Sequence, residues 1–550
     1  MGTHITVKRE SKTRRQFIAS TAVTTLGMML TSRVRAVAAA HTEPREEFDY
    51  IVVGAGSSGC VVANRLSEDR DVSVLLLEAG GPDNDPRLRK FPAEFSTLLG
   101  TKFDWKYATE PEKNLNSRRI DWPRGRLLGG TSSINGMVYI RGHREDYDHW
   151  SKLGNTGWAY DNVLPLFMKS ESNSRFEGEY HGLNGLMSVE SVLDNSEIKE
   201  AMFRSVEGHG FKTDATWDFN AGEQAGTAGY YQFQIKDGER HSAASAFLTP
   251  FLDRPNLAAR PWSLASRLLW EGNRIVGVEY VSNEWDVHTV RARREVVVSA
   301  GVIDSPQLLM LSGIGPASEL KQQEIPVKCE LPGVGQNLQD HVCVSIVFQP
   351  SREVLPQVRG TGGLFFHSSQ ADRQDAPDLQ CYWSDYYTKN PLGTFSKSGL
   401  WLCASLGLPD SRGTITLRSA NPLDKPVIRA NYLQSQRDMP RLVEGFSFLR
   451  EAVNGEAFKG LIAKEITPGE QTDAETAIRQ NGTTIFHPVG TCKMGTDAMS
   501  VVDPQLRVRG IDGLRIADAS IMPRIINGNT NAPCIMIGEK AAELIKSDGA

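Results

Sequence analysis

The chain has 550 residues, of which 40% are hydrophobic and 23% are charged, a composition typical of a globular protein long enough for about two or three domains. Its formal net charge is −5, and residues 1–40 hold seven Lys/Arg and one Glu, so the remainder carries 54 basic against 65 acidic residues, a net charge near −11. This acidic balance argues against nucleic acid or an anionic membrane as the natural partner.

The beginning of the chain is typical of an export signal. Arg14 and Arg15 precede an apolar run from Phe17 to about Thr31, and a small-residue stretch follows at 36–40. The run is about fifteen residues long, whereas a membrane span needs roughly 20. A charged start, a short apolar core and an A-x-A-like site predict a cleaved twin-arginine signal peptide over residues 1–40. We therefore expect a protein without a transmembrane span that is exported to the periplasm, or secreted, after folding around a cofactor. A basic tail is the alternative.

The cysteines give no sign of a metal centre. None of them falls in a C-x-x-C pair, so we predict no zinc or iron–sulfur site and no other metal. Their odd number leaves at least one thiol unpaired. The seven cysteines are Cys60, Cys329, Cys343, Cys381, Cys403, Cys492 and Cys534.

The stretch 50–78 predicts a dinucleotide-binding β-α-β unit. Buried strands are expected at 50–53 and 72–77, and GAGSSG at 54–59 turns into the helix between them. The first glycine permits the turn, the second lets the backbone approach a pyrophosphate, and the third packs helix on strand. Glu78 can accept hydrogen bonds from an adenosine ribose. The motif alone does not separate NAD from FAD. The residues predicted to bind the cofactor here are Gly54, Gly56, Ser57, Ser58, Gly59, Glu78 and Ala79.

A second glycine-rich segment, GRLLGGTSSINGMV at 125–138, has few side chains large enough to block a flat ligand. Glycines followed by hydroxyls and an amide suit a loop laid against a polar ring edge or a phosphate. A purely structural loop is the alternative. The predicted cofactor residues of this segment are Arg126, Gly129, Gly130, Ser132, Asn135, Gly136, Met137 and Val138.

This segment resembles, nearly position by position, the first signature of the glucose–methanol–choline (GMC) flavoprotein oxidoreductases. SAGVIDSPQLLMLSGIGP at 299–316 resembles their second signature, although Val302 departs from the small residue common there. Family-like blocks run from about residue 48 to about 545. The resemblance is strongest to the branch of choline dehydrogenases and aliphatic alcohol dehydrogenases.

The resemblance implies FAD and an α/β fold of two parts. One part is a discontinuous Rossmann-like FAD-binding domain at 44–165, 255–340 and 490–550. The other, at 166–254 and 341–489, is a substrate-binding domain with an antiparallel sheet covered by helices. Some relatives attach the flavin through a histidine in a G-G-x-x-x-H pattern, where this chain has Ile134. We therefore expect non-covalent FAD.

The end of the chain supplies further cofactor residues. A short strand is expected at 514–517, and it ends at Asp518, which can bond the ribityl or pyrophosphate region of the flavin. An amphipathic helix opens at Asn531, with Pro533 in its first turn. The positive end of this helix can face the flavin pyrimidine. The predicted cofactor residues here are Asp518, Ala519, Asn531 and Ala532.

Alcohol oxidation needs a base for the hydroxyl proton and an acceptor for the hydride, and the resemblance makes flavin N5 the acceptor. His487, in HPVGTCKMG, resembles the family's catalytic histidine block and is predicted to be the general base. Asn531 matches the second active-site position, where relatives carry His or Asn, and is predicted to hold the substrate oxygen. A plain helix N-cap is its alternative. His341 is expected to be structural, near the edge of the flavin domain.

These residues predict an FAD-dependent alcohol dehydrogenase or oxidase that converts a small-molecule alcohol into an aldehyde or ketone. Oxygen, a quinone or a cytochrome would each suit as electron acceptor. The alternatives are a lyase or photochemical enzyme, an exported FAD-binding protein without turnover, and an NAD-dependent enzyme. The sequence does not name the alcohol. Candidate aromatic residues for its pocket are Tyr382, Trp383, Tyr386 and Tyr387.

Overall fold

The protein is described from a computed structural model, which covers residues 46–90, 92–193, 196–352, 361–372, 374–384 and 399–548. Its seven-stranded sheet contains the predicted β-α-β unit: β1 (Glu47–Val53), α2 (Ser57–Leu66) and β2 (Val74–Leu77). β1 pairs in parallel with both β2 and β16 (Val287–Val298), as a β-α-β crossover requires. The other strands are β13 (Leu257–Arg260), β14 (Ser263–Glu271), β15 (Arg274–Ser282) and β27 (Leu514–Ile516).

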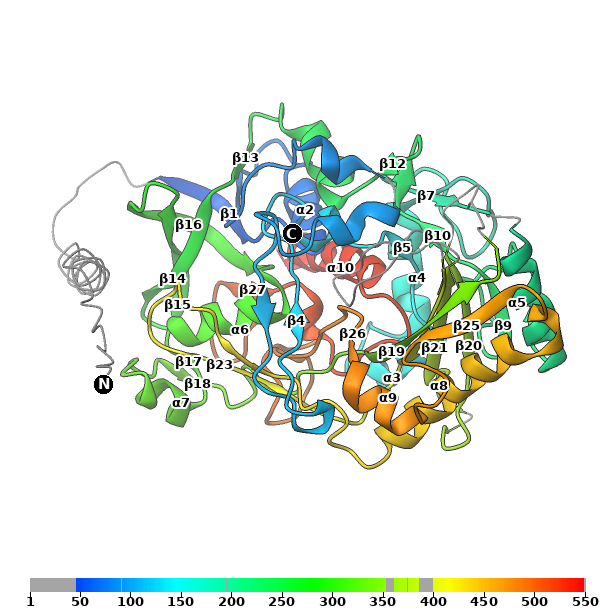
Figure 1. Cartoon of the computed structure of the whole chain (residues 1–550). Helices are drawn as coiled ribbons and strands as arrows, with labels where there is room; N and C mark the ends of the chain where they lie inside the picture. The colour runs from blue at the N-terminus through cyan, green and yellow to red at the C-terminus, as the bar shows by residue number, and fades with distance from the viewer. Residues whose placement is uncertain are drawn as a thin grey trace, which may run out of the picture. The chain divides into compact units, whose positions relative to one another are not determined.

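Helix α10 (Asn531–Asp548) packs along α2, as Figure 1 shows in red and blue. The close approach depends on Gly538, because a Cβ there would come within 2.8 Å of the Ser58 carbonyl oxygen. A buried ion pair of 2.7 Å between Arg65 and Glu539 joins the same two helices. The end of the chain is thereby fixed against its first helix, which brings Asn531 to the glycine-rich turn.

A six-stranded sheet has only antiparallel pairs, as the family resemblance implies. Helix α8 (Asp438–Asn454) packs against it. All of its strands lie within 341–489, while those of the first sheet lie within 44–165, 255–340 and 490–550. The division into two domains stays a prediction. The strands are β19 (Val342–Pro350), β20 (Gly362–Phe366), β21 (Leu379–Ser384), β22 (Leu400–Leu406), β25 (Ile462–Thr467) and β26 (Thr483–Thr484).

The remaining elements are short. A four-stranded sheet consists of β5 (Val138–Tyr139), β10 (Gln232–Phe233), β7 (Met187–Ser191) and β6 (Glu171–Asn173). The other helices are α3 (Arg144–Lys152), α4 (Tyr160–Ser170), α5 (Glu197–Gly208), α6 (Gly301–Leu311), α7 (Ala317–Gln322) and α9 (Ala474–Asn481). Short strands pair two by two: β3 (Tyr107–Ala108) with β4 (Asp121–Trp122), β8 (Lys212–Thr213) with β9 (Thr227–Tyr230), β11 (Ile235–Lys236) with β12 (Glu239–Arg240), β17 (Ile314–Gly315) with β18 (Cys329–Glu330), and β23 (Thr414–Thr416) with β24 (Val427–Arg429).

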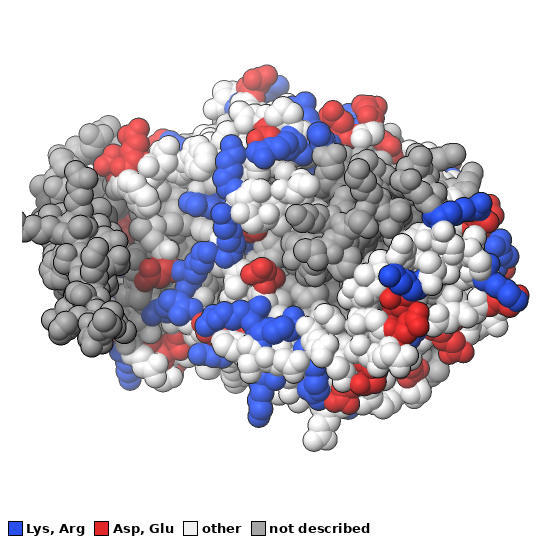
Figure 2. All heavy atoms as spheres, viewed as in Figure 1, with Lys and Arg blue, Asp and Glu red and all other residues white. Residues whose placement is uncertain are grey.

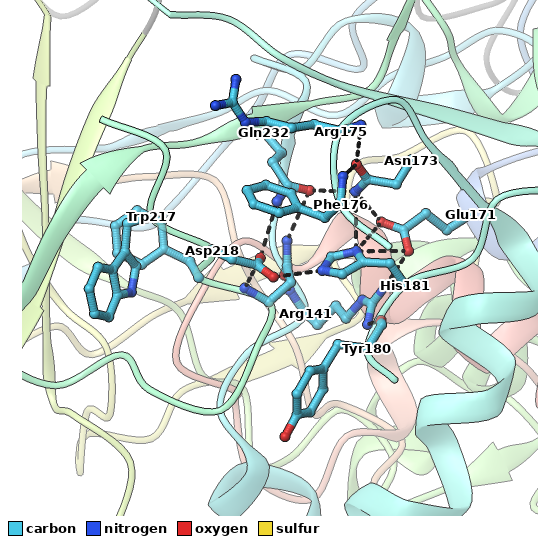
Figure 3. A network of polar contacts seen from close by, with 12 residues as sticks. Arg141, Glu171, Asn173, Arg175, Phe176, Tyr180, His181, Trp217, Asp218 and Gln232 are labelled. Atoms are coloured by element: carbon cyan, nitrogen blue, oxygen red, sulfur yellow. Dashed lines mark hydrogen bonds and ion pairs between the residues drawn. The ribbon is translucent and has the colours of Figure 1, made fainter. Parts of the chain in front are cut away.

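A buried polar network holds the four-stranded sheet in place (Figure 3). Arg141 and Glu171 form an ion pair whose two side chains are wholly buried. His181 lies between two carboxylates, with Nδ1 3.2 Å from Glu171 and Nε2 2.7 Å from Asp218. Burial disfavours its charged form, but these hydrogen bonds outweigh burial and raise the pKa of His181. The network reaches β10 through Gln232, whose amide donates to Asp218.

The surface carries its charge unevenly. On the face seen in Figure 2, Lys and Arg side chains form a band across the middle of the described surface, and Asp and Glu lie mostly nearer its edges. The net charge of −5 is therefore an average over a surface whose sign varies locally. Within the described ranges, no helix combines the length and the apolar character that a bilayer crossing requires.

The ion pair between Arg141 and Glu171 yields a first prediction. Replacing Glu171 by Gln would leave the Arg141 guanidinium buried without a counter-charge, so we expect the free energy of unfolding to fall by about 3–5 kcal/mol. Equilibrium unfolding in urea measures the change. Glu200→Gln is the control, because its pair with Arg204 is exposed and 3.9 Å long, and it should change stability by less than about 1 kcal/mol. Equal effects of the two substitutions would contradict the prediction.

Candidate active site

A cavity of about 410 Å³ is lined by both large sheets. Val53 and Leu77, at the carboxyl ends of β1 and β2, lie on one wall, which is where open α/β sheets bind their ligands. Cys343 and Tyr382, from β19 and β21, lie on another. The cavity therefore joins the predicted dinucleotide site to the antiparallel sheet.

The glycine-rich turn leaves space for a phosphate. Gly56 lines the cavity, and a Cβ on it would meet no other atom closer than the Ser299 carbonyl oxygen at 4.0 Å. It is also the N-cap of α2 and makes no side-chain capping bond, so the first amides of the helix are left for a ligand. Ser58 lines the cavity too, and its buried hydroxyl has no hydrogen-bond partner among the residues that the structure describes. These features fit the pyrophosphate of FAD.

Glu78 fits the ribose. Its carboxylate accepts hydrogen bonds from the amides of Ala55, at 2.9 Å, and Gly80, at 2.8 Å. A carboxylate has about four acceptor positions, so others are left for ribose hydroxyls. Burial is the main cause that raises the pKa of Glu78 to about 7; these two hydrogen bonds, and to a smaller extent the charge of Arg126, oppose it. Arg126 itself stacks 4.7 Å from the ring centre of Trp105.

Not every predicted cofactor residue reaches the cavity. The Gly129 amide donates a hydrogen bond of 2.8 Å to the Ala55 carbonyl oxygen, and the Ser132 hydroxyl accepts one of 2.9 Å from the Ala243 amide. These two residues therefore stabilise the loop without lining the cavity. Ile134, in the place of the linking histidine of some relatives, does line it. The predicted residues on the lining are Gly54, Gly56, Ser57, Ser58, Glu78, Ala79, Gly130, Asn135, Gly136, Met137, Val138, His487, Asp518, Ala519 and Asn531, and those not on it are Gly59, Arg126, Gly129, Ser132 and Ala532.

The carboxylate of Asp518 is engaged with the protein. It accepts hydrogen bonds from the Gly301 amide at 2.9 Å, the Ser305 hydroxyl at 2.6 Å and the Ser520 amide at 2.8 Å. Asp518 thus ties the end of β27 to the first turn of α6. Any contact with the flavin comes in addition to this structural role.

His487 belongs to a chain of hydrogen bonds that defines its tautomer. His341 Nε2 is 2.8 Å from the Gly407 carbonyl oxygen, which can only accept, so this nitrogen carries the proton. His341 Nδ1 is then the acceptor for His487 Nδ1, 3.0 Å away. His487 Nε2 is left with its lone pair, which faces the amide nitrogen of Asn529 at 3.0 Å. The tautomer is assigned from these partners.

Electrostatics keep both histidines neutral. Burial is the largest cause and lowers the pKa of His341 to about 4. It also lowers the pKa of His487, where the charges of His341 and Arg124 act in the same direction. His341 was expected to be structural and near the edge of the flavin domain, and the latter stays a prediction; the structure adds that its ring contacts His487. Nothing in QNLQDH signals this contact.

Asn531 begins α10 and lies on the cavity wall. Its amide oxygen accepts a hydrogen bond of 2.5 Å from Ser57, and its amide nitrogen donates to Gln234. One amide N–H therefore remains without a partner among the described residues. Gln234 and Asn529 lie in no motif that marks them as functional residues, and neither was predicted.

The wall around His487 is mostly apolar or aromatic. Tyr382 lines it, as predicted, and its hydroxyl donates to Asn529 at 3.2 Å. Trp383 does not line the cavity and is fully buried in the core. Tyr386 and Tyr387 lie outside the described residues. Other lining residues from the antiparallel sheet and the segments next to it are Cys343, Thr361, Trp401, Cys403, Ile485 and Phe486.

Comparisons with known proteins agree with this geometry. Family models described as GMC oxidoreductase match residues 48–343, for the N-terminal part, and 409–538, for the C-terminal part. The chain is 40% identical to an alcohol dehydrogenase [acceptor] of Pseudomonas putida, with 90% of this chain and 95% of that one covered. It is also 40% identical to the mitochondrial choline dehydrogenase of Homo sapiens, with 96% and 94% covered. The crystal structure of pyridoxine 4-oxidase from Mesorbium loti superposes with a TM-score of 0.83 at 30% identity, covering 90% of this chain and 98% of that one.

The packing of Gly59 gives a second prediction. A Cβ at this position would lie 1.9 Å from the Gly54 carbonyl oxygen, which is backbone and cannot move aside cheaply. Gly59→Ala should displace the start of α2 and weaken FAD binding at least about tenfold, or about 1.4 kcal/mol. Titration of the apoprotein with FAD measures this. Gly208→Ala, at the end of α5 where a Cβ would meet nothing within 4 Å, should bind FAD normally. Unchanged affinity in Gly59→Ala would show that the turn tolerates a side chain.

Proposed function

We propose that this chain, which belongs to the GMC oxidoreductase family and uses FAD, oxidises the CH–OH group of a small alcohol to an aldehyde or ketone. The observation that carries the proposal is His487, a buried neutral histidine whose Nε2 accepts from Asn529, both residues lining the cavity that Gly56 and Ser58 also line. A neutral imidazole is the form that can accept a proton. The names of the relatives, alcohol dehydrogenase and choline dehydrogenase, support the same reaction class.

In the proposed reaction His487 takes the hydroxyl proton of the substrate on Nε2, where Asn529 donates in the present structure. His341 holds the ring in the required tautomer through Nδ1. FAD, when bound, accepts the hydride of the carbinol carbon. Asp340 accepts the backbone amide of His487 at 2.9 Å and so helps to fix the position of the histidine.

Asn531 has the proposed role of holding the substrate oxygen. Ser57 and Gln234 fix the plane of its amide from two sides. The N–H that they leave over can donate to the oxygen while negative charge develops there. The beginning of α10, at the same residue, adds a positive partial charge.

Export and the electron acceptor belong to the proposal as well. Arg14, Arg15 and the short apolar run support a twin-arginine signal, and residues 1–40 lie outside the described residues. The periplasm would make oxygen, a quinone or a cytochrome accessible as acceptor. The mass of the protein recovered from the periplasm of an expressing bacterium tests export, because cleavage near residue 40 shortens the chain.

The role of His487 can be tested directly. In His487→Ala the substrate loses its base, so we expect the rate of flavin bleaching by an alcohol under anaerobic conditions to fall by about 10²–10⁴-fold. Stopped-flow absorbance in the flavin band measures the rate. His288→Ala is the control, because that histidine is exposed on β16. A yellow wild-type protein that no alcohol bleaches would favour the alternative of an FAD-binding protein without alcohol oxidation.

The pH dependence follows from the lowered pKa of His487. The neutral base predominates above its pKa, so a lowered pKa extends activity to lower pH. We expect kcat/KM to rise with pH to a plateau, with an apparent pKa below about 6.5, the ordinary value for histidine. Steady-state rates across the acidic range measure this. An apparent pKa at or above the ordinary value would mean that His487 is not held neutral by its surroundings.

A further inference from the structure

Arg124 places a guanidinium on the cavity wall beside His487. It lies two residues after the end of β4, and its side chain reaches the segment that contains His487. Nε donates to the Pro123 carbonyl oxygen at 2.6 Å, and Nη2 donates to the Phe486 carbonyl oxygen at 2.6 Å. Nη1 has no partner within the part of the chain that the structure describes. Arg124 is also the only arginine among the described residues that line the cavity.

The charge of this guanidinium is not neutralised by contact. Both of its acceptors are uncharged carbonyl groups, and it makes no ion pair with any described residue. The carboxylates of Asp340 and Asp104 act on it only from farther away. Burial lowers the pKa of Arg124, but an arginine stays protonated in proteins. The cavity therefore contains a fixed positive charge.

Two neighbouring residues, His487 and Cys534, indicate where the charge of Arg124 lies. It lowers the pKa of His487 on one side, and it acts on Cys534 in the first turn of α10 on the other. Arg124 thus lies near both the proposed base and the helix start that the sequence predicts to face the flavin pyrimidine. A helix start contributes about half an elementary charge, and an arginine contributes a whole one.

We propose that Arg124 is the counter-charge for the negative charge that the flavin pyrimidine gains on reduction, and that it thereby sets how easily FAD is reduced. The inference rests on the proposed function. In that reaction the hydride carries two electrons and one proton from the carbinol carbon to the cofactor, and the hydroxyl proton goes to His487. The cofactor therefore gains one negative charge, which a fixed cation nearby stabilises.

The test compares Arg124→Met with Arg124→Lys and with Arg118→Met. Arg118 is a matched control: it is half-buried and bonds carbonyl oxygens, at 3.2 Å to Leu115 and 2.5 Å to Gly482, but it does not line the cavity. The midpoint potential of the bound flavin is measured against a reference dye during chemical reduction, without any alcohol. The dissociation constant of sulfite, whose addition to the flavin leaves negative charge on the pyrimidine, is a second readout.

In Arg124→Met we expect the equilibrium constant for reduction of the bound flavin to fall at least about tenfold. For a two-electron couple this lowers the midpoint potential by about 30 mV. Sulfite affinity should fall by a similar factor. Arg118→Met should leave both unchanged, and Arg124→Lys should keep most of the wild-type value because it keeps the charge. A wild-type potential in Arg124→Met overturns the proposal, as does a higher KM for the alcohol as the only change.

If Arg124→Met does not retain FAD, the test compares Arg124→Lys with Arg124→Gln, which has no charge at this position. Equal midpoint potentials of the bound flavin in these two variants would show that the charge is not what matters. Because reduction is chemical, these results stand even if no alcohol proves to be a substrate. Failure of every alcohol to bleach the flavin would count against the proposed function and leave the inference about Arg124 intact.

Discussion

The contact between the two glycine-rich loops is the constraint on which the rest of the site depends. A Cβ on Gly130 would come within 2.8 Å of the Gly56 Cα, and the Gly129 amide donates to the Ala55 carbonyl oxygen at 2.8 Å. Because no side chain fits between the loops, their backbones form one floor under the cavity. The start of α2 projects from this floor, α10 packs on α2 through Gly538, and Asn531 is thereby brought to Ser57. The same packing thus positions both the glycine-rich turn predicted to bind the cofactor and Asn531, which is proposed to hold the substrate.

Sequence analysis predicted the parts of this arrangement whose cause is local. The buried strands β1 and β2, the turn at Gly54 and the helix that opens at Asn531 all follow from neighbouring residues, and the structure contains each of them. The partners of His487 were not predictable in this way. His341 and His487 meet because β19 pairs with β26, Val342 opposite Thr484, and that register is set by tertiary packing.

Polar residues in the motifs show a further limit of prediction. Asp518 and Arg126 were both predicted to bind the cofactor, which stays a prediction for each. Asp518 lines the cavity but also bonds Gly301 and Ser305, and Arg126 stacks on Trp105 outside the lining. A pattern of residue types indicates that a donor or acceptor is needed in a region, but not which group it meets. Asn529 shows the opposite: it donates to His487 although it was not predicted, and it lies in the sequence between the predicted residues Ala519 and Asn531. Only distances between side chains separate these roles.

The electrostatics of the cavity differ between its two ends. The difference suits binding of a nucleotide at one end and the proposed proton transfer at the other. At the nucleotide end, burial raises the pKa of Glu78 to about 7, so that this carboxyl group repels a pyrophosphate less than an ordinary carboxylate would. At the other end the histidines are neutral and the charge is that of Arg124. In the proposed reaction a proton would leave the substrate there toward His487, while negative charge would move onto the cofactor beside Arg124. Burial is the main cause of the shifts at both ends, and its consequence depends on whether the buried group is an acid or a base.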